Sequence, residues 1–139
     1  MVSRVLVPVD GSEMGEHALE YALEVFPDGD ITVLHVVGGP SPMWGEAAGL
    51  ALADDIQEKA NELAASAFER AEEIAAENDQ EISTTVQLGH PARVIVNRAE
   101  DYDTVVIGAH GGTLADRLIV GNVAETVFRR SPVPVIVVR

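Results

Sequence analysis

The chain of 139 residues lacks cysteine and contains a single lysine, Lys59. Without thiols it forms no disulfide, no thiolate metal site and no cysteine-based catalytic centre. No apolar run approaches the roughly 20 residues of a membrane-spanning helix. The opening Met1–Arg4 leads directly into a short apolar segment, without the apolar core or cleavage site of a signal peptide. We therefore expect a cytoplasmic protein with one domain over residues 1–139.

Basic residues are scarce. Nine lysines and arginines face 23 acidic residues, which gives a formal net charge of −14. This charge repels nucleic acid and anionic lipid, so we expect neither as a partner. An acid-rich, lysine-poor composition resembles that of proteins from salt-accumulating organisms, where a Debye length of roughly 3 Å at about 1 M salt screens the repulsion. The composition therefore suits a halophilic source.

Strand-like and helix-like segments alternate along the chain. Such alternation requires a parallel sheet with right-handed crossovers, which is a doubly wound α/β domain with helices on both faces. The third strand alternates apolar and polar residues, as an edge strand does. The predicted strands are Arg4–Val9, Ile31–Val37, Ile82–Leu88, Thr104–Ile107 and Pro134–Arg139, and the predicted helices are Glu13 to about Val25, about Ala47 to Glu77, Gly89 to about Asp101, and Asn122–Arg130.

Helical spacing also predicts which side chains face the core. The first helix, capped by Ser12, is expected to bury Met14, Ala18, Tyr21, Ala22 and Val25. The helix from Gly89 to about Asp101 is expected to bury Val94, Ile95 and Ala99. The long helix is expected to bury Ile56, Ala60, Leu63, Ala67, Phe68, Ala71, Ile74 and Ala75, with its glutamates on a solvated face.

The stretch from Gly108 to Asn122 lies between an apolar strand and a helix. Its glycines permit positive φ and close approach of a ligand to the backbone. The following helix start offers unpaired N–H groups and a partial positive charge, which suit a phosphate. Asn122 is also a favourable N-cap residue. Spacing alone slightly favours the simpler interpretation, in which the glycines make turns and Asn122 caps the helix.

The pattern G-x2-G-x9-G-N, formed by Gly108, Gly111, Gly121 and Asn122, resembles the nucleotide loop of the universal stress protein family. The family pattern ends in Gly followed by Ser or Thr, so Asn122 departs from it. Four further segments resemble the family in the same order: Val5–Glu13, Val33–Val36, Gly89–Pro91 and Ser131–Val138. The resemblance implies a five-stranded sheet of order 3-2-1-4-5.

The resemblance further implies bound ATP or AMP with Mg²⁺, and a homodimer formed through Val135–Val138. Asp10 and Val9 would lie near ribose and base, with Pro8 shaping the turn, and the backbone of Val36 would contact adenine. The residues implied at the nucleotide are Pro8, Val9, Asp10, Val36, Ile107, Gly108, His110, Gly111, Gly121, Asn122 and Val123.

Taken without the family, several of these residues have two interpretations. Asp10 suits a ribose contact as well as a turn in which it bonds its own backbone. His110 either donates to a phosphate or faces water. Asp116 and Arg117 are candidates for magnesium and phosphate contact, or simply polar loop residues. Trp44 lies in the irregular stretch Gly38–Gly45. Its side chain either packs against the protein and holds the loop in place, or covers a ligand or contacts a partner.

Other chemistries are disfavoured. His35 lies in an apolar strand and is interpreted as a core histidine, and four scattered histidines make no metal site. A P-loop needs Gly-Lys-Ser or Gly-Lys-Thr, but Lys59 lies in a helix. No G-x-G-x-x-G follows the first strand, and no base and nucleophile form a pair. We expect an ATP-binding, nucleotide-dependent stress-response or regulatory module. The alternatives are a dimeric interaction protein that binds no nucleotide, and a slow ATPase.

Because clustered carboxylates repel one another when unscreened, the melting temperature should rise from dilute buffer to molar potassium chloride. Thermal melts followed by circular dichroism test this. A melting temperature that stays flat or falls would remove the argument for a halophilic protein.

Overall fold

The computed structural model describes residues 2–37, 53–109 and 121–139. The predicted Gly38–Gly45 loop with Trp44 lies outside the described residues. The elements are β1 (Arg4–Val9), α1 (Glu13–Val25), β2 (Asp30–Val37), α3 (Ala53–Glu77), β3 (Ser83–Leu88), α4 (Pro91–Ala99), β4 (Thr104–Gly108), α5 (Asn122–Arg130) and β5 (Val135–Val138).

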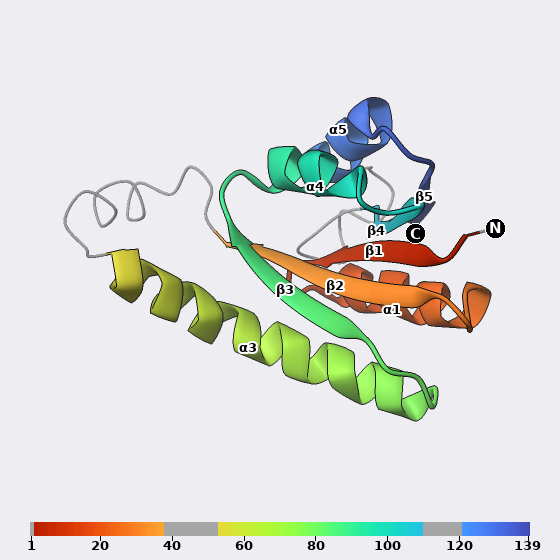
Figure 1. Ribbon diagram of the computed structural model, residues 1–139, viewed down its shortest axis with the longest axis horizontal. Coiled ribbons are helices and arrows are strands. Elements are labelled where there is room, and N and C mark those ends of the chain that lie inside the picture. Colours follow the sequence, from red (N-terminus) through yellow and green to blue (C-terminus); the bar gives the residue numbers. More distant parts are fainter. Residues whose placement is uncertain (1, 38–52, 110–120) are drawn as a thin grey trace.

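The five strands form one sheet in the order β3-β2-β1-β4-β5, and every neighbouring pair is parallel. The predicted fold class and strand order are confirmed. Helices α1 and α3 cover one face of the sheet, and α4 and α5 cover the other (Figure 1). Strand β3 lies at one edge, as its alternating sequence predicted, and β5 lies at the opposite edge.

Successive side chains of each strand enter opposite cores, because strand side chains alternate between the two faces. One core packs against α1 and α3, and the other packs against α4 and α5. The first receives the buried strand residues Val5, Val7, Ile31, Val33 and Val106. The second receives Leu6, Leu34, Val105 and Ile107. Burial on both faces explains the nearly continuous apolar sequences of β1, β2 and β4.

The predicted inner face of α1 is partly wrong. Tyr21 and Val25 are 40% and 42% exposed. Leu19 and Leu23 are buried in their place, beside the correctly predicted Met14, Ala18 and Ala22. Because α1 packs against α3 as well as the sheet, the buried stripe is rotated toward Leu19 and Leu23, which share the helical spacing of Met14, Ala18 and Ala22.

The other helices follow their predictions over the described residues, and the predicted start of the long helix at about Ala47 lies outside them. In α3 the residues Ala71, Ile74 and Ala75 are buried, Ala67 and Phe68 are half-buried, and the side chains of Ile56, Ala60 and Leu63 lie outside the described part. Helix α4 ends at Ala99, two residues before its predicted end, where the chain turns into β4.

Charge is divided between the two helical layers. Helices α1 and α3 carry the acidic side chains Glu13, Glu16, Glu20, Glu24, Glu58, Glu62, Glu69, Glu72, Glu73 and Glu77. Helices α4 and α5 carry the basic residues Arg93, Arg98, Arg129 and Arg130 with one acidic residue, Glu125. The repulsion inferred from the composition is therefore concentrated on the α1–α3 side of the sheet.

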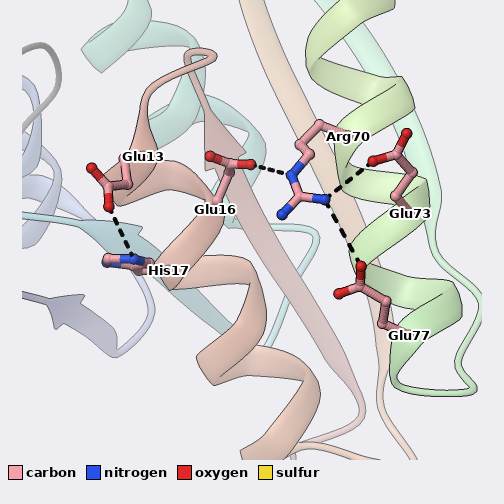
Figure 2. A network of polar contacts seen from close by, with 6 residues as sticks. All are labelled: Glu13, Glu16, His17, Arg70, Glu73 and Glu77. Carbon is pink, nitrogen blue, oxygen red and sulfur yellow. Dashed lines mark hydrogen bonds and ion pairs between the residues drawn. The ribbon is translucent and has the colours of Figure 1, made fainter.

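Arg70 is the one basic residue, histidine aside, among the described side chains of α1 and α3. Its guanidinium lies 2.5 Å from Glu16 of α1, 3.1 Å from Glu73 and 3.9 Å from Glu77 (Figure 2). The hydrogen bonds that Arg70 donates to Glu16 and Glu73 raise the pKa of Arg70. Arg70 thus links the first turns of α1 to α3 across a surface whose other described charged side chains, histidine aside, are acidic.

Asp103 holds the start of β1. Its Oδ2 accepts hydrogen bonds from the Ser3 N–H at 2.9 Å, the Arg4 N–H at 2.8 Å and the Ser3 hydroxyl at 3.0 Å. The Arg4 and Ser3 donors favour the ionised carboxylate, so they lower the pKa of Asp103. A side chain from the turn before β4 thereby fixes the first residues of the central strand.

Asp103→Ala should lower the melting temperature at neutral pH by a few degrees. The folded-state pKa lies below the unfolded value of about 3.9, so this stabilisation is present above that value and is lost as pH falls through the folded pKa. The difference between parent and variant should therefore shrink below about pH 4 in melts recorded from neutral to acid. Asp101→Ala, a nearby exposed carboxylate, is the matched control, and a difference that is independent of pH would contradict this assignment.

Candidate functional site

The two central strands separate toward their carboxyl ends. Strand β1 pairs with β2 along its whole length, from Arg4 to Val9. In the described residues, its register with β4 covers only Val5–Thr104 and Leu6–Val105. Pro8 lies beyond the last pair, where its missing N–H costs no ladder hydrogen bond. The chain continues from β1 toward one edge of the sheet and from β4 toward the other, so this separation lies at the point where ligands bind in doubly wound folds.

The turn after β1 is built by Asp10, Gly11 and Ser12. The Ser12 N–H donates to Asp10 Oδ1 at 2.9 Å, which is the backbone-bonding role open to an aspartate in a turn. Gly11 has a φ of +85°, a conformation that favours glycine. Ser12 caps α1 as predicted, accepting from the Gly15 N–H at 3.4 Å. Asp10 is exposed, and Oδ2 has no hydrogen-bond partner within the described ranges.

Two glycines bring the start of α1 close to both strand ends. A Cβ on Gly15 would lie 3.4 Å from Val9 Cα, and a Cβ on Gly108 would lie 2.9 Å from the Met14 carbonyl oxygen. Gly108 therefore needs to be glycine for helix packing, whether or not a ligand approaches it. Gly15 could not be singled out from the sequence, because an isolated glycine within a helical pattern carries no specific signal.

Helix α5 begins at the same edge, and its cap differs from the prediction. Gly121 is the N-cap, and Asn122 is the first helical residue, without a capping side chain. The Gly121 N–H donates to the Ala109 carbonyl at 2.5 Å, and the Gly121 carbonyl accepts from the Glu125 N–H at 2.9 Å. These two bonds fix the helix start at Gly121, so the expected capping role of Asn122 is wrong. The N–H groups of Asn122, Val123 and Ala124 precede the first intrahelical bond and are left unpaired by the helix.

The remaining predicted residues divide into two groups. Pro8 and Val9 lie at the end of β1, Val36 near the end of β2, and Ile107 at the end of β4, all on the carboxyl side of the sheet. The side chain of Ile107 is buried against α4 and α5. The loop residues His110, Gly111, Asp116 and Arg117 lie outside the described residues.

A model of the universal stress protein family matches residues 1–139. The chain belongs to this family. Universal stress protein MJ0577 of Methanocaldococcus jannaschii is 30% identical over 155 residues, covering 100% of this chain and 96% of that protein. Its solved structure matches with a TM-score of 0.78 and 27% identity, over 99% of this chain and 96% of that one.

Two other solved members of the universal stress protein family contain nucleotides. One is a complex with cAMP, with a TM-score of 0.70 and 22% identity over 99% of this chain and 97% of that one. The other, from Arabidopsis thaliana, has AMP bound, with a TM-score of 0.60 and 18% identity over 98% and 90% of the two chains. At these identities the likeness is one of fold.

In this universal stress protein His35 is satisfied within the fold, as predicted. Its Nδ1 lies 3.0 Å from the Val9 carbonyl oxygen, and its ring packs edge-on against Phe68. His17 lies 3.8 Å from Glu13 (Figure 2). No group of three or more metal-ligating side chains occurs in the part of the chain that the structure describes. No helix in that part is long and apolar enough to cross a membrane.

Proposed function

We propose that the whole chain is a cytoplasmic, nucleotide-dependent stress-response module that binds ATP, with Mg²⁺, between the ends of β1 and β4. The observation that carries the proposal is the loss of pairing after Leu6–Val105. It leaves the carboxyl ends of the two central strands apart, beside the start of α5. This is the place from which the chain continues toward one edge of the sheet after β1 and toward the other after β4. The proposal concerns binding and regulation, because residues 2–37, 53–109 and 121–139 contain no base paired with a nucleophile that would indicate catalysis.

The start of α5 supplies groups suited to phosphate. The first-turn N–H groups of Asn122, Val123 and Ala124 have no intrahelical acceptor, and the helix start carries a partial positive charge of roughly half a unit. Gly121 contributes through its missing side chain. Its N–H is engaged by Ala109, so its value to a ligand lies in the absent side chain.

The end of β1 supplies groups suited to the nucleoside. Asp10 keeps one carboxylate oxygen for the ribose hydroxyls while the other shapes the turn. Pro8, Val9, Val36 and Ile107 come from three adjacent strands and would form the base side of the site. Binding of cAMP and AMP by relatives of the same fold supports an adenine nucleotide. Magnesium would be held mainly by the triphosphate itself.

The competing proposal is an interaction protein that has lost nucleotide binding. Its support is Asn122, which stands where the family pattern has Ser or Thr. Because Asn122 is not the helix cap, its substitution can be used to probe the ligand without removing a cap. This separates the two proposals experimentally.

We also propose a homodimer through β5. Strand β5 lies at the sheet edge, and its four residues Val135–Val138 are apolar and only half-buried. Ile136 and Val138 pack toward α1 and α3, whereas Val135 and Val137 pack toward α4 and α5. An uncovered apolar edge favours pairing with another strand. A salt-rich cytoplasm, inferred from the net charge of −14, would screen the repulsion between two such chains.

Gly121→Val should abolish ATP binding while the fold persists. Gly121 has an extended backbone, with φ of −67° and ψ of 158°, that valine adopts readily. Its branched side chain would then occupy the phosphate position.

Asn122→Ala should lower the affinity for ATP by roughly ten- to a hundredfold if the Asn122 side chain donates to a phosphate, because this is the effect of losing one hydrogen bond to a charged group. Asp10→Ala should lower the affinity for ATP and the affinity for adenosine by the same factor. Isothermal titration measures the affinity, and thermal melts check that the fold persists.

Asn122→Ser, which restores the Gly-Ser pair of the family, is the matched control and should bind at least as tightly as the parent. Mass spectrometry of nucleotide released on heat denaturation identifies the natural ligand. ATP binding by Gly121→Val at parental affinity, or no nucleotide with any variant or the parent, would favour the interaction protein.

Ile136→Lys and Val137→Lys should each convert the dimer into a monomer or an aggregate, because a lysine on either side of β5 places charge on the pairing edge. Light scattering measures the mass, and circular dichroism checks the fold. Thr84→Lys, on the opposite edge strand β3, is the control and should leave the mass unchanged. An intact dimer for both β5 variants would place the interface elsewhere.

A further inference from the structure

His35 lies beside the last residue of β1. The final pair in the register of β1 with β2 is Val9 with His35. His35 Nδ1 lies 3.0 Å from the Val9 carbonyl oxygen. A carbonyl oxygen only accepts hydrogen bonds, so Nδ1 carries the proton and donates. The contact therefore fixes the tautomer of His35 as well as its orientation.

The imidazole ring is held in place from α3. The rings of His35 and Phe68 are 6.3 Å apart between centroids, with an interplanar angle of 82°. This edge-to-face arrangement is the favoured geometry of aromatic pairs. His35 and Phe68 are both half-buried. The donor is thus oriented toward Val9 by packing, before any ligand arrives.

Val9 depends on such support. In the described residues the pairing of β1 with β4 ends at Leu6, so the last three residues of β1 have a neighbouring strand on one side only. On the helix side, Gly15 packs close to Val9 Cα. The bond from His35 adds a fixed point at the end of the strand, where the ladder to β4 is missing.

The Val9 carbonyl belongs to the same peptide group as the Asp10 N–H. Because a trans peptide is planar, its C=O and N–H point in opposite directions. Anchoring the Val9 oxygen on His35 therefore directs the Asp10 N–H away from His35 and sets the direction in which the chain leaves β1. Asp10 follows at once, with its carboxylate bonded to the Ser12 N–H.

We propose that His35 is a positioning residue for the nucleoside end of the site. Through its bond to Val9 it fixes the Val9–Asp10 peptide and hence the carboxylate of Asp10. The phosphate end, at the start of α5, does not depend on it. The inference rests on the proposed function for its ligand, but the positioning itself exists in the free protein.

Two variants separate positioning from packing. In His35→Asn the amide nitrogen is as many bonds from the backbone as Nδ1, so it retains a donor for Val9. His35→Leu fills space but removes the donor. In the free protein, amide exchange measured by NMR should become about tenfold faster at Asp10 and Ser12 in His35→Leu and remain parental in His35→Asn. The amides of Val105 and Val106 in β4 serve as internal controls and should be unchanged in both.

Titration then tests the ligand. His35→Leu should lower the affinities for ATP and adenosine by the same factor, about three- to tenfold, because this is the effect of losing one neutral hydrogen bond. Inorganic triphosphate should bind as in the parent, and His35→Asn should restore ATP affinity to within about twofold. A uniform loss for all three ligands would identify His35 as a packing residue and overturn the inference.

The exchange measurements and the titrations test separate claims. If the parent binds no nucleotide, the proposed function falls, and the exchange rates still decide whether His35 positions Asp10. If exchange at Asp10 and Ser12 is parental in His35→Leu, the inference is wrong whatever the protein binds.

Discussion

The arrangement of the site depends on the short register between the two central strands. Strand β1 is paired with β2 throughout, and β4 is paired with β5 from Val105 to Gly108. In the described residues, β1 and β4 pair with one another only at Val5–Thr104 and Leu6–Val105. The right-handed crossovers carry the chain outward in opposite directions from this point. Backbone groups at the carboxyl ends of β1 and β4 are therefore not used for pairing between these two strands.

Close packing of α1 determines how that edge is shaped. Glycines at positions 15 and 108 allow the first turns of α1 to approach Val9 and the end of β4. The same helix is tied to α3 by Arg70 and Glu16 (Figure 2). The β1–α1 turn, which carries Asp10, therefore connects two elements that are both held by packing. Preorganisation of this kind lowers the entropic cost of binding.

Charge has a separate role from the core. The acidic side chains gather on α1 and α3, whereas α4 and α5 carry more basic than acidic residues. The start of α5, where a phosphate would bind, thus belongs to the less negative layer. A net charge of −14 does not by itself prevent the binding of an anion, because the local charge and the helix dipole matter most within a Debye length of about 8–10 Å.

The sequence by itself determined the alternation of elements, the parallel sheet, the edge position of β3 and the carboxyl-end location of Asp10 and Gly108. These follow from local apolar periodicity, and the resemblance to the universal stress protein family supplied the strand order. Only the tertiary structure decided that Leu19 and Leu23 replace Tyr21 and Val25 in the core, that Gly121 and not Asn122 caps α5, and that His35 bonds Val9. Each of these depends on a contact between segments distant in sequence: α1 with α3, Ala109 with Gly121, and β2 with β1. Apolar periodicity does not decide among the possibilities, because these contacts are set by the packing of whole elements.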